Sequence, residues 1–302
     1  MNVLVTGGAG LIGMAAREAL AARGHEVTAI DITDYGRGDA ALTHLGLDAR
    51  APLESLIEAR DIDAIVHAGA ISGPMLAKGQ PLLVVATNID GTALLLDLAR
   101  VKGMKRFVFC SSVSVYGDVG PAVITEERPL HQTSIYGATK VACEQLIEGF
   151  AAEFGLSGVS LRIARAYGPY RRANCYLGAI IRDADAGRLT EIPCAPDFPY
   201  HYVYVDDVAD AIAAALEAEN LSSFAYNVSG AAPLTMPEIA TVAARAIPNA
   251  QIRLVPGADD VPDLQTTFDL SRAGAELGWA PARDLARGLR DYAAAIHAGR
   301  AA

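Results

Sequence analysis

Three side chains near the middle of the chain are of the types that perform acid–base chemistry. Tyr136 and Lys140 stand four residues apart in a helix-like stretch, so a phenol and an ammonium group project from one face. Ser112 directly follows the apolar, strand-like run Phe107–Ser111, and its hydroxyl can hydrogen-bond a substrate oxygen. A phenol ordinarily has a pKa of about 10, so it needs nearby positive charge to act as a base near neutrality. We therefore predict that Tyr136 is the base, that Lys140 supports it and that Ser112 orients the reacting hydroxyl.

A glycine-rich turn near the start of the sequence has the spacing of a dinucleotide-binding loop. Gly7, Gly10 and Gly13 follow the strand-like run Val3–Thr6 and lead into a helix-like stretch. In such loops the glycines permit a tight turn, a close approach of backbone amides to a pyrophosphate, and close packing of helix on strand. The helix start also favours the negative charge of the phosphates. The predicted cofactor contacts in this loop are Gly7, Gly10, Leu11, Ile12 and Gly13.

Asp31 ends the second strand-like run, Val27–Asp31. A carboxylate at this place can bind both hydroxyls of an adenine ribose, and it repels the 2′-phosphate of NADP. No arginine follows immediately to accept such a phosphate, and Arg37 is the nearest candidate. We therefore predict NAD as the cofactor.

These residues require a framework that brings the ends of several strands together. Short apolar runs alternate with helix-like stretches through the first half, which predicts right-handed βαβ units. The fold class is therefore α/β, a Rossmann-type doubly wound parallel sheet with a smaller C-terminal substrate-binding lobe. We place the NAD-binding domain at 1–165 and mainly the lobe at 166–302, with some later strands and helices returning to the sheet and both parts packed as one unit. The remaining predicted strands are Ala64–His67, Phe107–Ser111 and Leu161–Ala164, and the predicted helices are Ile12–Ala22, Thr92–Val101, Asp207–Ala218 and Ile239–Ala246.

The overall composition argues against several other classes of protein. A net charge of −10 disfavours non-specific binding to nucleic acid, which needs a positive surface. Charged residues or glycine interrupt each apolar run, so we expect no membrane span. The sequence enters a strand without a basic leader segment, which predicts a cytoplasmic protein. We expect neither a metal site nor disulfides, because no metal-ligand or C-x-x-C spacing connects Cys110, Cys143, Cys175 and Cys194.

The glycine loop, the serine-containing strand and the Tyr-x-x-x-Lys spacing together resemble the extended short-chain dehydrogenase/reductase family, in its NAD-dependent epimerase/dehydratase group. The resemblance covers nearly the whole chain. It extends to His67-Ala68-Gly69-Ala70, Asn88 within 87–92, Leu161-Arg162, Tyr167-Gly168-Pro169, the run 202–208 and Glu276-Leu277-Gly278-Trp279.

The resemblance implies roles for individual residues. Ser112, Tyr136 and Lys140 would form the catalytic set, Asp31 would bind ribose and Asp48 would lie near adenine, while His67 would be structural. Relatives often dimerise through two long helices, here about 92–101 and 136–154, which implies a homodimer. The further cofactor contacts that the resemblance implies are Ala68, Gly69, Ala70, Asn88, Ser111, Tyr136 and Lys140.

The sequence departs from the family where members acting on nucleotide-diphospho-sugars bind the diphosphate. Those members usually carry Arg-Asp-Phe where this chain has Tyr200-His201-Tyr202, and asparagine where it has Arg165. A guanidinium at 165 could pair with a carboxylate or phosphate of a smaller substrate, although Arg171 and Arg172 are competing anion ligands. The predicted substrate contacts are Ser112, Ser114, Arg165, Asn174 and Tyr200.

Three functions fit this pattern. The favoured one is an NAD-dependent oxidoreductase that removes hydride from a secondary alcohol of a sugar, sugar acid or similar small polyol, with Tyr136 as base. The alternative is a nucleotide-sugar epimerase, such as a 4-epimerase, with tightly bound NAD. A catalytically silent NAD-binding protein is less favoured, because the Ser-Tyr-Lys set is complete, although a fold alone does not dictate activity.

Overall fold

A parallel sheet of seven strands forms the centre of the computed structural model, which describes residues 1–73, 79–172, 175–258 and 263–300. The strand order is β11-β6-β5-β4-β1-β2-β3, and every neighbouring pair is parallel. The order reverses beside β1, which confirms the predicted doubly wound α/β sheet. The strands are β1 (Asn2–Thr6), β2 (Glu26–Asp31), β3 (Leu42–His44), β4 (Ala64–His67), β5 (Arg106–Ser112), β6 (Gly158–Ile163) and β11 (Ala225–Val228).

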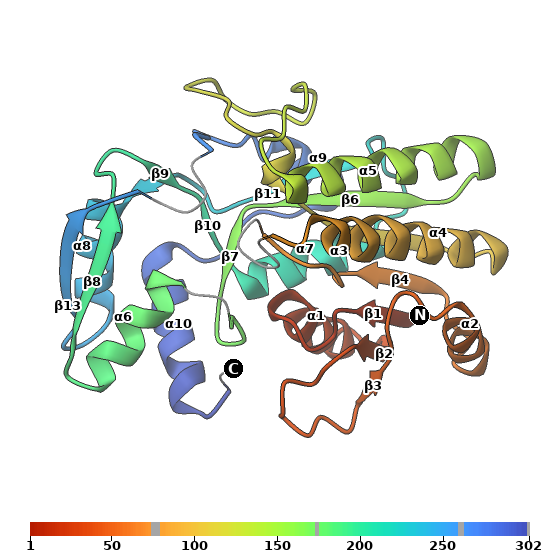
Figure 1. Cartoon of the computed structure of the whole chain (residues 1–302), viewed down its shortest axis with the longest axis horizontal. Helices are drawn as coiled ribbons and strands as arrows, with labels where there is room; N and C mark the ends of the chain where they lie inside the picture. Colours follow the sequence, from red (N-terminus) through yellow and green to blue (C-terminus); the bar gives the residue numbers. More distant parts are fainter. Residues whose placement is uncertain (74–78, 173–174, 259–262, 301–302) are drawn as a thin grey trace.

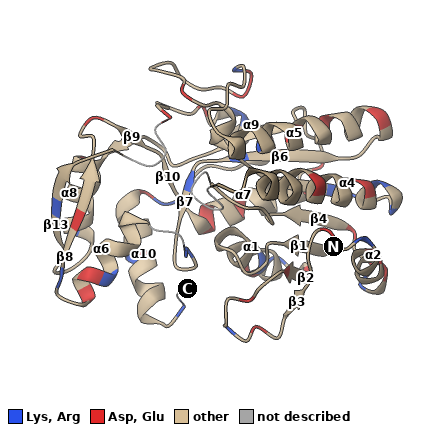
Figure 2. Ribbon diagram, in the orientation of Figure 1, with Lys and Arg blue, Asp and Glu red and all other residues tan. Residues whose placement is uncertain are grey.

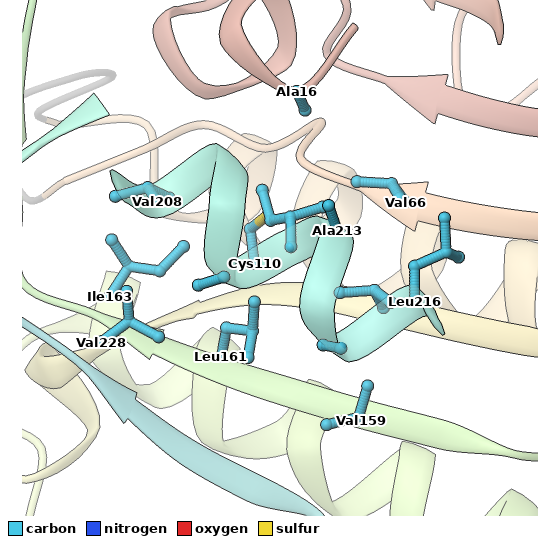
Figure 3. Close-up of a cluster of buried hydrophobic side chains, with 14 of the residues drawn as sticks. Ala16, Val66, Cys110, Val159, Leu161, Ile163, Val208, Ala213, Leu216 and Val228 are labelled. Atoms are coloured by element: carbon cyan, nitrogen blue, oxygen red, sulfur yellow. The ribbon is translucent and has the colours of Figure 1, made fainter. Parts of the chain in front are cut away.

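Helices cover both faces of this sheet (Figure 1). One face carries α1 (Leu11–Ala22) and α7 (Val205–Glu217), and the other carries α2 (Arg50–Ala59), α4 (Gly91–Val101) and α5 (Ile135–Phe154). The strands are apolar because both of their faces are buried, and all seven residues of β5 are buried. Figure 3 shows the α7 side of this core, where Val208, Ala213 and Leu216 lie over Val66, Cys110 and Leu161.

One helical stretch is more apolar than the sequence-based expectation of no membrane span had suggested. The residues of α3 (Pro81–Val85), the π-helical turn η1 (Ala86–Asp90) and α4 follow one another as Pro81–Val101, which is long and apolar enough by composition to cross a membrane. Almost half of its most apolar window, 44%, is buried inside the fold. Leu95, Leu96 and Leu98 are completely buried in the core between α4 and the sheet. Packing on the sheet therefore accounts for the apolar residues of the α4 part, whereas Leu82 and Leu83 of α3 are exposed.

A second layer of structure forms the smaller lobe, seen to the left in Figure 1. Three two-stranded pairs build it together with three helices, and it has its own apolar core. By contrast, α7, β11 and α9 (Ser271–Leu277) come late in the sequence and pack with the main sheet. The lobe contains β7 (Arg165–Tyr167) with β10 (Tyr202–Tyr204), β8 (Leu189–Cys194) with β13 (Gln251–Pro256), β9 (Pro199–Tyr200) with β12 (Leu234–Thr235), and helices α6 (Tyr176–Asp185), α8 (Met236–Ala246) and α10 (Leu285–His297).

Charged residues lie mainly on helices and loops, and the central strands are largely uncharged (Figure 2). Within the described ranges, no group of three or more His, Cys, Asp or Glu residues could hold a metal ion. The four cysteines are free thiols, and three of them are buried. The polar groups at the carboxyl ends of the strands are therefore the ones to consider for chemistry.

Candidate active site

The glycine loop between β1 and α1 is shaped for a dinucleotide. Gly7 adopts a left-handed conformation with φ of 66°, and an added Cβ there would lie 2.7 Å from the backbone of Ala68. An added Cβ at Gly13 would lie 2.0 Å from the carbonyl oxygen of Gly7. The helix begins at Leu11, so the first-turn amides, including that of Ile12, point out of the helix without intrahelical partners. This cradle fits a pyrophosphate.

The ribose end of the site is marked by a carboxylate beside the same loop. Asp31 ends β2, and its Oδ2 accepts a hydrogen bond of 3.1 Å from the amide of Ala9. Asp48 is exposed in the turn after β3, and the neighbouring Leu47 packs beside Gly69. The structure therefore places Asp31 at the edge of the glycine loop, and Asp48 lies in a turn whose Leu47 packs beside Gly69. The binding roles of both residues stay predictions.

The loop after β4 is held in place by buried polar contacts. Asn88 is 2% exposed, and its side chain bonds both the amide and the carbonyl of Ile71, at 2.9 and 3.2 Å. Its Nδ2 also donates to Thr139 in α5 at 3.0 Å. These bonds fix the loop that contains the predicted contact segment Ala68–Ala70. The cofactor contact expected for Asn88 stays a prediction.

His67 is a structural residue, as the resemblance implied. Its Nδ1 lies 2.7 Å from the hydroxyl of Thr6, and its Nε2 lies 2.9 Å from the hydroxyl of Thr92. Burial, with a smaller contribution from the Lys140 charge, lowers the pKa of His67 to about 3. The imidazole is therefore neutral at physiological pH and ties β1, β4 and α4 together.

Lys140 brings a buried positive charge between β5 and the predicted base. Its Nζ donates to the carbonyl oxygen of Cys110 at 2.8 Å and lies 5.8 Å from the centre of the Tyr136 ring. The Lys140 side chain is 3% exposed and Tyr136 is 9% exposed. Ser134 caps α5 by accepting a hydrogen bond from the third amide of the helix, which fixes the start of the turn that carries Tyr136.

Ser112 is the last residue of β5, at the carboxyl-terminal edge of the sheet. Its Oγ accepts a hydrogen bond from the amide of Ser114 at 3.2 Å and lies 3.2 Å from the Ser114 hydroxyl. Ser112 is 9% exposed, and Ser114 is half-buried. Ser112 belongs to the end of β5, and Lys140 is hydrogen-bonded to Cys110, two residues before Ser112 in the same strand. Both side chains are therefore held at the end of one strand. A sugar hydroxyl held at this edge would meet a hydroxyl, a phenol and a nearby ammonium group.

A buried charge pair lies beneath this site, and the sequence interpretation did not find it. Arg162 of β6 donates through Nη2 to the carboxylate of Glu144 at 2.7 Å, and its Nη1 donates to the Tyr116 hydroxyl at 2.9 Å. Although burial opposes it, the bonds and charge of Glu144 raise the pKa of Arg162. The available signal was spacing, because Glu144 stands four residues after Lys140 and so on the same side of the helix.

Ser111 belongs to this buried pair and not to the open edge. Its hydroxyl donates to Glu144 at 2.5 Å, and the residue is 4% exposed. This bond turns the Ser111 side chain toward Glu144, because successive residues of a strand point to opposite faces. Its expected contact with the cofactor stays a prediction.

Two of the predicted substrate contacts, Arg165 and Tyr200, lie on the lobe side of the strand ends. The guanidinium of Arg165 lies 5.3 Å from the Tyr200 ring centre and 5.8 Å from that of Tyr202. Tyr200 is 2% exposed and its ring stacks at 9° on that of Tyr202, so little of Tyr200 is open to a ligand. His201 is buried and bonded to the Gln265 carbonyl at 2.9 Å. Asn174, also predicted as a substrate contact, lies outside the described residues.

Comparison with known sequences points to one family. The family model for the "NAD dependent epimerase/dehydratase family" matches residues 3–229. A UDP-glucose 4-epimerase from Corynebacterium glutamicum is 32% identical over 234 residues, which cover 72% of this chain and 71% of the relative. UDP-glucuronic acid decarboxylase 1 from Arabidopsis thaliana is 29% identical, with 96% of this chain and 68% of the relative covered.

Solved structures show the same similarity over the whole chain. The UDP-glucose 4-epimerase of Thermotoga maritima, solved with UDP-glucose, matches with a TM-score of 0.90 and 25% identity, covering 99% of each chain. The UDP-glucose 4-epimerase of Thermus thermophilus, solved with NAD, matches with a TM-score of 0.87 and 27% identity, covering 98% of this chain and 99% of that one. The second match agrees with the dinucleotide-shaped loop described above.

Proposed function

We propose that this chain, which belongs to the NAD-dependent epimerase/dehydratase family, inverts one carbon of a nucleotide-linked sugar. It is an NAD-dependent enzyme of the extended short-chain dehydrogenase/reductase type. The observation that carries the proposal is the buried Lys140 ammonium, fixed on the Cys110 carbonyl and 5.8 Å from the Tyr136 ring. An ammonium in this position stabilises a phenolate, and a phenolate is the base that removes a hydroxyl proton.

Each residue of the set has a distinct task in the proposed reaction. Tyr136 removes the proton from a sugar hydroxyl, and Ser112 hydrogen-bonds the same oxygen and so orients it. Lys140 stabilises the Tyr136 phenolate before it takes the proton. The neutral phenol then holds that proton until the return step. Bound NAD supplies the acceptor of the hydride and, for an epimerase, its donor in the return step. Tyr136 then returns the proton to the same oxygen, while the configuration at carbon has changed.

The comparisons support a nucleotide sugar better than the small polyol favoured from the sequence. UDP-sugar 4-epimerases recur among both the sequence relatives and the solved structures, and UDP-glucuronic acid decarboxylases occur among the sequence relatives. Those relatives are other proteins, and this chain has Tyr200 where nucleotide-sugar members usually carry the arginine that binds the diphosphate. A nucleotide sugar would therefore have to find its cations elsewhere in the lobe, and Arg165 is the first candidate.

A direct test uses the purified chain with a panel of UDP-sugars, free sugars and sugar acids. Product stereochemistry and the absorbance of reduced cofactor are followed together. An epimer that forms without net NADH supports the proposal. Net NADH formation with no epimer contradicts it. The base is tested separately by Tyr136→Phe, which should lower kcat about a hundredfold or more and leave NAD affinity nearly unchanged, and retained turnover would rule out Tyr136.

A second candidate is a dehydrogenase of a free sugar acid. The specific observation behind it is the aromatic pair Tyr200 and Tyr202, which stacks on Arg165 where nucleotide-sugar enzymes usually have a diphosphate arginine. A guanidinium beside aromatic rings can present its planar edge to a carboxylate. NADH release with sugar acids, lost in Arg165→Gln, would favour this candidate.

A homodimer remains part of the proposal. Large apolar side chains are exposed along the outer helices, including Leu82 at 81%, Phe154 at 48% and Val101 at 53%. Covering these side chains with a second copy would remove apolar surface from water. Light scattering of the purified chain measures its mass, and a monomer at micromolar concentration would contradict a dimer of this kind.

A further inference from the structure

Arg37 occupies a special position beside the glycine loop. It lies in the connection between β2 and β3, and its Nη1 donates to the carbonyl oxygen of Ala9 at 2.8 Å. The amide of the same Ala9 donates to the carboxylate of Asp31 at 3.1 Å. A guanidinium and the predicted ribose-binding carboxylate are therefore held by the two polar backbone groups of a single loop residue.

Two of the three guanidinium nitrogens of Arg37 lack an acceptor. Its Nε and Nη2 are shielded from solvent and meet no hydrogen-bond partner within the described part of the chain, nor does any carboxylate there lie within ion-pair distance. Arg17 provides a contrast, because it also reaches the loop, through Gly8, but is neutralised by Asp39 at 2.6 Å. Unpaired charged donors are costly to bury, so the Arg37 site is suited to an anion.

Aromatic rings from both parts of the molecule hold this guanidinium. The centre of the Arg37 guanidinium lies 5.7 Å from the Tyr35 ring and 5.8 Å from the Tyr170 ring. Arg172, from the lobe, lies 4.3 Å from the Tyr35 ring. Tyr35 itself has a φ of 57°, and Asp34 accepts the amides of the two following glycines that shape this turn. The rings and the turn hold the guanidinium beside the glycine loop. Because Nε and Nη2 are shielded from solvent, a phosphate reaches them only when a neighbouring side chain, such as the exposed Tyr35, moves aside.

We propose that Arg37 binds the adenosine-side phosphate of the NAD pyrophosphate. If Asp31 binds the ribose hydroxyls, that phosphate is only one methylene group from the same ribose, on the side of the glycine loop. Arg37 then supplies a forked, charge-assisted contact in addition to the amides at the start of α1. This inference rests on NAD as cofactor and on the ribose role of Asp31, and it is independent of the sugar substrate.

The test compares ligands that differ by a single phosphate. Dissociation constants of adenosine, 5′-AMP, 2′-AMP and NADH are measured by calorimetry or displacement of NADH fluorescence, after removal of any co-purified nucleotide. Arg37→Gln should weaken 5′-AMP and NADH about ten- to a hundredfold and adenosine less than about twofold. Arg37→Lys should fall between them, because it keeps the charge and loses the fork. Arg172→Gln is the matched control, which removes a cation from the other face of Tyr35 and should change 5′-AMP binding less than about fivefold.

Each remaining outcome contradicts the assignment. Equal weakening of adenosine and 5′-AMP would mean that Arg37 only supports the loop. A selective loss of 2′-AMP binding would place the contact at the ribose phosphate of NADP instead. Unchanged 5′-AMP and NADH binding in a folded variant would remove Arg37 from the site. Because every readout is binding without sugar, failure of the proposed epimerase reaction leaves this test intact.

Discussion

The buried pair of Glu144 and Arg162 offers the sharpest test of how the catalytic edge is held together. Glu144 is 2% exposed and Arg162 is 4% exposed, and the guanidinium makes bonds of 2.7 to 3.2 Å to the carboxylate. Glu144→Gln keeps the shape and the acceptor for Ser111 but removes the charge. In the described ranges Arg162 has no other ion-pair partner. It would therefore be left as an unpaired charge in the core.

The expected loss of stability follows from this burial. Breaking a buried ion pair by removing one partner typically costs about 3 to 5 kcal/mol, because the remaining charge loses its compensation. With a urea m-value of about 3 kcal/mol per M, this cost lowers the unfolding midpoint by about 1 to 1.7 M. Glu54→Gln is the matched control, since Glu54 pairs with Arg50 at 2.9 Å on the surface. Its cost should stay below about 1 kcal/mol.

A double-mutant cycle separates coupling from general damage to the core. Arg162→Met alone leaves Glu144 charged and buried, whereas the double variant Glu144→Gln/Arg162→Met leaves neither charge. We expect the double variant to be more stable than the sum of the single losses predicts, by about 2 kcal/mol or more. Additive losses, or a Glu144→Gln cost no greater than that of Glu54→Gln, would refute the idea that this charge pair holds β5, β6 and α5 together.

Three further perturbations test the cofactor half and its surroundings. Gly13→Ala should lower NAD affinity by at least tenfold or prevent folding, because the added Cβ would lie 2.0 Å from the Gly7 carbonyl oxygen. Calorimetry measures the NAD affinity and circular dichroism measures folding. Normal affinity in a folded variant would contradict the close packing of α1 on the glycine loop. Asp31→Asn should reduce the preference for NADH over NADPH by about tenfold or more in fluorescence titrations, and an unchanged ratio would exclude the ribose role. Burial lowers the pKa values of His67 and His201 to about 3 and 4, below the 6.5 of the unfolded chain. The unfolded state therefore binds protons first as pH falls below about 6.5. The free energy of unfolding, followed by urea denaturation, should drop from pH 6.5 to 4.5 by up to about 1.4 kcal/mol per pH unit for each histidine. His201→Gln should lessen this slope, and an identical slope in the variant would contradict the contribution of His201.

The cofactor half of the site could be predicted because its determinants are local in sequence. Gly7, Gly10 and Gly13 lie in one turn between a strand and a helix, and spacing alone fixes what each can do. The main strands were also predictable, since strands buried on both faces are continuously apolar. Short or partly exposed elements were missed, such as β3 with three residues and the amphipathic α2.

The contacts of the catalytic residues could not be predicted in the same way. The sequence placed Tyr136 and Lys140 on one helical face, but the bond from Lys140 to the Cys110 carbonyl depends on how α5 packs against β5. Glu144 and Arg162 are charged residues, which are usually exposed, so only their pairing across the core explains their burial. The hydrogen bonds of Asn88 to the backbone of Ile71 likewise depend on how the loop after β4 packs against it, which the sequence does not show.

The substrate-binding part of the site depends still more on tertiary structure. Its residues also differ from those that the family resemblance leads us to expect. Tyr202 is the partner of Arg165 in the register of β10 and β7, which places an aromatic ring against the guanidinium. A neighbouring strand position that carries arginine in nucleotide-sugar enzymes carries the buried Tyr200 here. A nucleotide diphosphate brings negative charge that needs cationic donors in a partly dry site. If the chain binds such a substrate, the Arg165 guanidinium has to supply positive charge that relatives place at other positions. Removing this guanidinium should therefore weaken the binding of UDP-sugars more than the binding of any uncharged sugar.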